Sequence, residues 1–307
     1  MRNRLRLACL LALALPASVA VAADPAPQTS PAPLLDAYFG LGAGYGWLAY
    51  DGSGVPGGSA DNNGVSVRGR ASFAAVTPGG LGWQADGVLQ YDAAAFDVGP
   101  VSFDDPTTTA TLASHLFWRD PNAGLIGVIG QYSDQRTQFD AGAATFSLHD
   151  KNYYAGVEGQ YFLDSVTLYG QVAYRAKRLA LGVGTSAVDG NGIILAAQAR
   201  YFVTPDWSFA VKGTFDTIRY DATTTRETVW QAGLRSEYRL ATLPVSLYGE
   251  VSYGQGHSKD STGFFEIDEK DTRAMVGVQY SLGARTLLER DRAGASLDPF
   301  ETHLTMP

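Results

Sequence analysis

Hydrophobic and polar residues alternate along most of the chain with a period of two. From Tyr153 to Leu163 every second residue is apolar, aromatic or glycine, whereas the residues between them include Glu158 and Gln160. The alternation resumes after a short polar break at 164–165. A period of two is typical of a β-strand with one apolar and one polar face.

The same pattern recurs twelve times between Ala37 and Gly283. We expect strands near 37–49, 64–77, 81–92, 107–119, 124–136, 151–163, 166–178, 191–204, 207–220, 226–240, 245–256 and 271–283. Their length, near twelve residues, exceeds the roughly 5–6 residues that are usual for strands of soluble proteins.

Short and long connections alternate between these strands. Short turns are expected at 78–80, 120–122, 164–165, 205–206 and 241–244. Longer loops rich in Gly and Asp are expected at 50–63, 93–106, 137–150, 179–190 and 257–270, with a briefer one at 221–225. This alternation predicts an all-β fold, a single transmembrane antiparallel β-barrel of about twelve strands with short periplasmic turns and longer extracellular loops.

Aromatic residues on the apolar face indicate whether that face meets lipid or is buried inside the protein. Several strands carry two of them eight residues apart, as Phe39 and Trp47 do, and this spacing covers about 20 Å along the axis of a tilted barrel. Two aromatic girdles at that separation fit the borders of a lipid bilayer. The predicted girdle residues are Phe39, Trp47, Trp83, Tyr91, Trp118, Tyr153, Tyr161, Tyr174, Tyr201, Trp207, Phe215, Trp230, Tyr238, Tyr253 and Tyr280. A soluble β-sandwich would show the same alternation with these residues in its core.

The first 23 residues have the composition of a Sec-type signal peptide. Three arginines precede an apolar run and a small-residue cleavage site near Ala22 or Ala23. The other expected segments are a Pro-rich linker at 24–35, the barrel at 36–283 and a polar periplasmic tail at 284–307. Loss of the signal peptide would remove the only cysteine, Cys9, and lower the formal net charge from −8 to about −11. That charge argues against nucleic-acid binding.

The chain resembles the Gram-negative outer-membrane β-barrel class, and within it porin-like members with twelve strands. The last strand, "AMVGVQYSLG", is similar to the C-terminal signal that such proteins present to the barrel-assembly machinery. The chain continues past this strand, unlike most members of the class. The resemblance implies a place in the bacterial outer membrane, with membrane lipid, lipopolysaccharide and the assembly machinery as partners.

If the apolar face meets lipid, the polar face lines the lumen. The predicted pore-lining residues are Arg68, Arg70, Asp86, His115, Glu158, Gln171, Gln198, Lys212, Arg235 and Glu250. Four of them carry a fixed positive charge and three a negative charge, which predicts weak charge selectivity with a slight preference for anions. The function we expect is that of a porin-like channel for passive diffusion of small hydrophilic solutes. Cross-strand ion pairs could instead close the interior of a structural or surface-binding barrel that acts through its loops.

No catalytic site, cofactor or metal centre is expected. Ser114 and His115 are successive residues of one strand and therefore point to opposite faces. His149-Asp150 and His257 with Asp260 leave a lipid-modifying enzyme or a protease as a less favoured alternative. The acidic residues predicted in the outer loops, which include Glu266, Asp268 and Glu269, are interpreted as a solvated rim.

Overall fold

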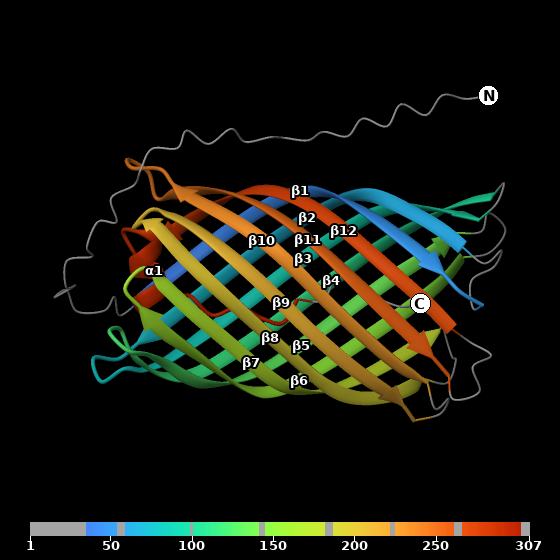
Figure 1. Ribbon diagram of the computed structural model, residues 1–307, viewed down its shortest axis with the longest axis horizontal. Coiled ribbons are helices and arrows are strands. Elements are labelled where there is room, and N and C mark those ends of the chain that lie inside the picture. Colours follow the sequence, from blue (N-terminus) through green and yellow to red (C-terminus); the bar gives the residue numbers. More distant parts are fainter. Residues whose placement is uncertain are drawn as a thin grey trace.

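The computed structural model describes residues 35–53, 59–98, 101–140, 145–181, 187–221, 225–260 and 266–301, and its strands form one closed barrel (Figure 1). The strands are β1 (Leu35–Asp51), β2 (Ser59–Val76), β3 (Leu81–Val98), β4 (Val101–Asp120), β5 (Gly124–Asp140), β6 (Thr145–Leu163), β7 (Val166–Leu181), β8 (Val188–Thr204), β9 (Trp207–Tyr220), β10 (Arg226–Arg239), β11 (Val245–Lys259) and β12 (Glu266–Leu282). A short helix, α1 (Leu287–Ala293), follows β12. The predicted all-β, twelve-stranded fold is confirmed.

Every strand pairs antiparallel with its neighbours in the sequence, and β1 closes the ring by pairing with β12. This seam runs from Ala37 opposite Leu282 to Asp51 opposite Asp268. Among the described residues, no helix has the length and hydropathy needed to cross a membrane. The predicted signal peptide and almost all of the predicted linker lie outside the described residues.

Ten of the twelve strands are longer than the sequence pattern predicted, and most of the extra length is at one end of the barrel. Their ends next to the short turns agree with the prediction to within two residues. At the opposite end β3 continues to Val98 and β4 begins at Val101, although 93–106 was expected to be a loop. The prediction of long loops was therefore partly wrong, because polar and small residues there continue the backbone pairing without the apolar alternation that signals a strand.

The outer surface of the barrel is apolar and the inner surface is polar. Large hydrophobic side chains on the outer face are exposed, among them Val157, which is 54% exposed midway between Tyr153 and Tyr161. The predicted girdle residues lie on this outer face, all but Trp207 counting among the exposed large hydrophobic residues. Most of the buried charged side chains belong to the inner face. An apolar belt of this extent suits contact with lipid better than contact with water.

The chain turns into the lumen at Gly283, directly after the last strand. Gly283 has a φ of 105°, a left-handed conformation that favours glycine. A Cβ atom at this position would lie 2.7 Å from the carbonyl oxygen of Leu35 and from a carboxylate oxygen of Asp36. Both the backbone angle and the close approach to β1 therefore call for a glycine here.

Residues 284–301, called the tail below, fold back inside the barrel. In Figure 1 the tail starts with α1 at the end that carries the short turns and continues toward the middle of the barrel. Most of its side chains are buried, and Leu297 has no exposed surface. The prediction of a polar tail in the periplasm was wrong for these residues. Most of their acidic, basic and apolar side chains find partners on the inner wall.

Candidate functional site in the barrel lumen

The base of the tail is attached to the first strand through Asp36. The carboxylate of Asp36 accepts hydrogen bonds from the backbone N–H groups of Ala284 at 2.9 Å and Ala295 at 2.7 Å. These two residues flank α1, so one buried side chain fixes both ends of the helical part of the tail. Gly294 passes so close to Asp36 that a Cβ at that position would lie 2.7 Å from its carboxylate carbon.

Helix α1 closes the end of the barrel that carries the short turns. Its N-cap residue Thr286 accepts a hydrogen bond from the Glu289 N–H at 3.0 Å. The Leu288 N–H donates to the carbonyl of Pro205 in the β8–β9 turn, and Leu287 and Leu288 pack against Phe202. The helix therefore has both a cap and an apolar contact with the wall.

Charged residues of α1 pair with charged residues of the wall. Arg290 lies 2.9 Å from Glu237 of β10. Asp291 has no exposed surface, forms an ion pair with Arg200 of β8 and accepts a hydrogen bond from Thr167 of β7. Buried charges need such partners, because their hydration is lost.

After α1, two glutamines of the wall hold the backbone of the extended part of the tail. Gln84 donates to the Leu297 carbonyl at 2.8 Å and accepts from its N–H at 3.2 Å. Gln131 makes the same pair of bonds with Phe300, at 2.9 and 2.8 Å. Each side-chain amide thus satisfies both backbone groups of one tail residue, as a neighbouring strand would.

Two apolar side chains of the tail insert between residues of the inner wall. Leu297 packs in a cluster with Phe117 and Tyr169. Phe300 stacks on Tyr154 with ring centroids 5.6 Å apart and also contacts Ile129 and Ile194. These contacts add apolar burial to the hydrogen bonds that hold the tail.

The last two acidic residues of the described tail meet arginines of β2. Asp298 lies 2.7 Å from Arg70, and Glu301 lies 3.0 Å from Arg68. Asp298 is also 3.7 Å from Arg200. The tip of the tail therefore supplies two carboxylates to three guanidinium groups.

Carboxylates of the wall are each shared by several partners. Glu250 of β11 lies 3.4 Å from Arg68, 3.4 Å from Arg235 and 3.8 Å from Lys212. Asp86 of β3 lies 3.2 Å from Arg70. In these contacts two carboxylates of the wall, Glu250 and Asp86, face four basic side chains of the wall.

His115 of β4 lies between two buried carboxylates. Its Nδ1 atom is 2.8 Å from Glu158 and its Nε2 atom 3.2 Å from Asp86, and all three side chains have no exposed surface. Glu158 also accepts a hydrogen bond from the Tyr169 hydroxyl at 2.7 Å. Because both ring nitrogens face acids rather than a nucleophile, this histidine is part of the packing of the lumen.

All ten residues predicted to line the pore have their side chains on the lumen side of the wall. Gln171 donates to the Asp298 carbonyl at 2.8 Å, and Gln198 accepts from Arg200 at 2.9 Å. The contacts given above place the other eight there. Their role in the passage of solutes stays a prediction.

Several residues of the site were missed in the sequence, namely Asp36, Gln84, Arg119, Gln131, Arg200 and the tail residues. Arg119 is buried and donates to the Gly294 carbonyl at 2.6 Å and to the Ser296 hydroxyl at 2.9 Å. The period of two does assign Arg200 to the same face as Gln198. The tail has no such repeat, so its place could not be read from periodicity.

A hollow lies beside the tip of the tail. Lys212, Thr214 and Gln231 line it from the wall, and Asp298 and Phe300 line it from the tail. The buried Thr214 hydroxyl has no hydrogen-bond partner among the described residues. The tail thus forms one side of a hollow inside the barrel that is lined by both polar and apolar residues.

The outer half of the lumen also contains ion pairs. Lys177 of β7 lies 3.2 Å from Asp150 and 3.3 Å from Glu227. Because Asp150 pairs inward and His149 is the preceding residue on the same strand, these two do not form the suggested acid–histidine pair. Glu269, expected on the solvated rim, is instead buried on the inner face with 1% of its surface exposed, so that interpretation was wrong for this residue.

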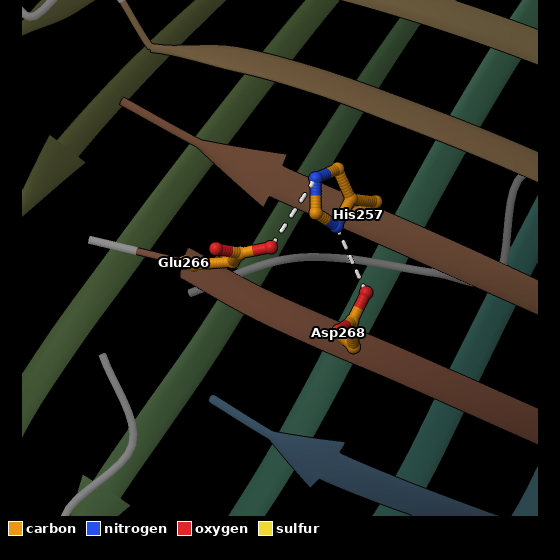
Figure 2. Close-up of side chains that lie close together, drawn as sticks. All are labelled: His257, Glu266 and Asp268. Atoms are coloured by element: carbon orange, nitrogen blue, oxygen red, sulfur yellow. Dashed lines mark hydrogen bonds and ion pairs between the residues drawn. The ribbon is translucent and has the colours of Figure 1, made fainter. Parts of the chain in front are cut away.

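Figure 2 shows His257 between two carboxylates at the outer ends of β11 and β12. Its Nδ1 atom lies 2.8 Å from Asp268 and its Nε2 atom 3.9 Å from Glu266, while Lys259 lies 3.4 Å from Glu266. The three donors are close enough together to be considered for a metal ion. The carboxylates, however, face different ring nitrogens, and one of them also pairs with a lysine. The arrangement is better explained as an exposed ion-pair network.

No protein-family model and no curated protein sequence matches the chain. Solved structures do match its fold. The translocator domain of the autotransporter NalP from Neisseria meningitidis is 12% identical over 82% of this chain and 89% of that one, with a TM-score of 0.53. The chain has the fold of an outer-membrane β-barrel.

Two other solved structures are also similar to this chain. The β domain of the Bordetella autotransporter BrkA is 11% identical over 80% of this chain and 99% of that domain, with a TM-score of 0.50. The porin KdgM is 13% identical over 78% of this chain and 99% of its own, with a TM-score of 0.37. At these identities the likeness concerns the fold alone.

Proposed function

We propose that this protein is a porin-like channel of the bacterial outer membrane for small hydrophilic solutes, and that its tail closes the lumen in the state described above. The apolar belt, with aromatic side chains at two levels, supports a place in a bilayer. The polar and charged inner wall supports a water-containing path rather than an apolar core. The proposal includes no catalytic step.

The observation that carries this proposal is that the tail is held by side chains and not by the strands of the barrel. Every strand pairs with two other strands, and β1 pairs with β12 without help from the tail. Withdrawal of the tail would therefore break no backbone ladder of the wall. A barrel that is complete without its plug can open without unfolding.

A permanently closed barrel is the second candidate. It is favoured by the depth of burial of Leu297 and Asp291 and by the ion pairs in the outer half of the lumen. Such a barrel would act through its outer loops and would conduct no ions. The two candidates differ in one property, which is whether the tail leaves the lumen.

A reversible disulfide between the tail and the wall separates these candidates. The predicted mature chain contains no cysteine, so Asp36→Cys with Gly294→Cys adds the only pair. A Cβ on residue 294 would lie 2.7 Å from the Asp36 carboxylate carbon, so the two cysteine side chains would be in contact, as a disulfide requires. Oxidation should hold the tail in place, whereas reduction should leave it without its Asp36 anchor.

The measurement is ion conductance of the refolded variant in a planar bilayer. We expect a silent bilayer with the oxidised protein and discrete openings after reduction. The parent protein, whose predicted mature chain has no cysteine, controls for effects of the reductant when it is treated in the same way. If the reduced protein folds as a heat-modifiable barrel and stays silent, the channel proposal is wrong and the closed barrel is favoured.

A further inference from the structure

Five basic side chains of the wall gather around the tip of the tail. This basic cluster consists of Arg68, Arg70, Arg200, Lys212 and Arg235. Arg70, Lys212 and Arg235 line two hollows. Arg200 and Asp298 also line the first. Arg68 and Glu301 also line the second. The cluster is therefore continuous around the two tail carboxylates.

Acidic groups of the wall do not balance the basic cluster. Glu250 pairs with Arg68, Lys212 and Arg235 at the same time. Asp86 and Glu158 also face His115, and Glu237 also pairs with Arg290 of the tail. The carboxylates that contact Arg200 in the described part of the chain, Asp291 and Asp298, both belong to the tail. The tail thus supplies the negative charge that the wall lacks.

Removal of the tail would leave these largely buried cations short of partners. Breaking a buried ion pair by removing one partner is strongly unfavourable, since the remaining charge has lost its hydration. An anion from solution that enters the cluster would offset this penalty. The open state is therefore stabilised by a solute that replaces the tail carboxylates.

We propose that the basic cluster is a binding site for small organic dianions, with short dicarboxylates as the preferred class, and that Asp298 and Glu301 occupy it as a built-in competitor. This inference rests on the proposed function and specifies its solute. Arg70 contacts both tail carboxylates, at 2.7 Å for Asp298 and 3.9 Å for Glu301. Two carboxylates within reach of one guanidinium are what a short dicarboxylate provides, and arginine binds carboxylates with a matching geometry.

The consequence is competition between the solute and the tail. A ligand shifts a two-state equilibrium only by as much as it prefers one of the two states. With the tail in place, the guanidinium groups of the cluster are already paired, so a dicarboxylate binds the tail-free lumen better. Its presence therefore raises the fraction of molecules in which the tail has left.

The test measures exposure of the tail with a single cysteine. Pro299 lines the cavity beside the tip, so Pro299→Cys places the only thiol of the mature chain there. Its rate of reaction with a small water-soluble thiol reagent is measured in lipid vesicles with succinate, with neutral succinamide, and with KCl at the same ionic strength as succinate. We expect succinate to raise the rate about five-fold or more, the lower end of usual coupling between two ligands. Succinamide and KCl should leave it nearly unchanged.

Charge variants of the Pro299→Cys protein distinguish displacement of the tail by bound succinate from a general loosening of the tail. Asp298→Asn should raise the basal rate, because it weakens the competitor, and should reduce the succinate effect to the extent that the tail is already out. Glu289→Gln removes the same charge from the tail, but Glu289 pairs with Arg285, away from the cluster, and it should behave like the parent. Arg200→Gln should also reduce the succinate effect, and heat modifiability checks that each variant has folded.

Equal rates with succinate, succinamide and KCl, or equal basal rates in Asp298→Asn and Glu289→Gln, would overturn the inference. The thiol assay needs no conductance, so its result is separate from the test of the channel. A conducting protein without a succinate effect would be a channel that lacks this site. A protein that conducts no ions but shows a succinate effect would have the dicarboxylate site without being a channel.

Discussion

The carboxylate of Asp36, the second residue of β1, accepts a hydrogen bond from the backbone N–H of Ala295 at 2.7 Å. Ala295 lies in the tail, 259 residues further along the chain. A second bond from the Ala284 N–H reaches the same carboxylate at 2.9 Å. One buried acid thus decides whether two buried N–H groups have an acceptor.

Asp36→Ala should release the tail. Each buried N–H group left without an acceptor costs about 1–3 kcal/mol, and this variant leaves two. Trypsin should then cleave at Arg290 and Arg292, which are buried while the tail is docked, at a rate at least ten-fold above that of the parent. Asp221→Ala, a change at an exposed residue of an outer loop, is the control. Equal cleavage of Asp36→Ala and its parent would show that Asp36 does not hold the tail.

Neutral tail carboxylates should make the protein conduct and prefer anions. In the double variant Asp298→Asn, Glu301→Gln the tip no longer supplies charge to Arg68 and Arg70, so the tail binds less tightly and the lumen keeps excess positive charge. We expect more frequent openings, with a reversal potential in a KCl gradient that indicates chloride preference. A cation-selective current would contradict this account of the wall.

His115→Leu should destabilise the barrel far more than His257→Leu. The first change leaves Glu158 and Asp86 buried without the ring between them, and removing one partner of a buried ion pair costs about 3–5 kcal/mol. His257 is exposed with its acidic neighbours, and exposed ion pairs contribute about 0–1 kcal/mol. Free energies of unfolding from denaturant titrations in lipid vesicles give the comparison. If both variants lose a similar free energy of unfolding, the buried contacts of His115 are no more stabilising than the exposed contacts of His257.

Val157→Arg tests the orientation of the apolar face. Val157 lies on the outer face midway between two girdle tyrosines, so the arginine would meet the middle of the bilayer. A charge at that depth should lower the free energy of unfolding by about 2–4 kcal/mol. Val157→Leu is the matched control and should stay close to the parent. An arginine tolerated as well as the leucine would place this face outside the lipid.

The strands and the orientation of their side chains could be predicted from the sequence because both follow a period of two. Arg70 and Asp86 were both predicted to face the lumen from neighbouring strands, and they lie 3.2 Å apart there. The tail could not be predicted in this way. Asp291, Asp298 and Glu301 find partners on β2 and β8, and such pairing depends on the shape of the closed lumen rather than on any local pattern. The excess of predicted lumen cations was the one sign that acids from elsewhere were needed.

The attachment of the tail to Asp36 also sets an order of assembly. The tail is the last described part of the chain to be synthesised, and β1 is the first, so their contact spans almost the whole sequence. Ala284 directly follows Gly283 at the end of β12, beside the seam where β12 meets β1. The hydrogen bonds to Asp36 can therefore form only when the ring has closed. Docking of the tail marks a finished barrel, and a tail that resists protease would identify molecules whose first and last strands have joined.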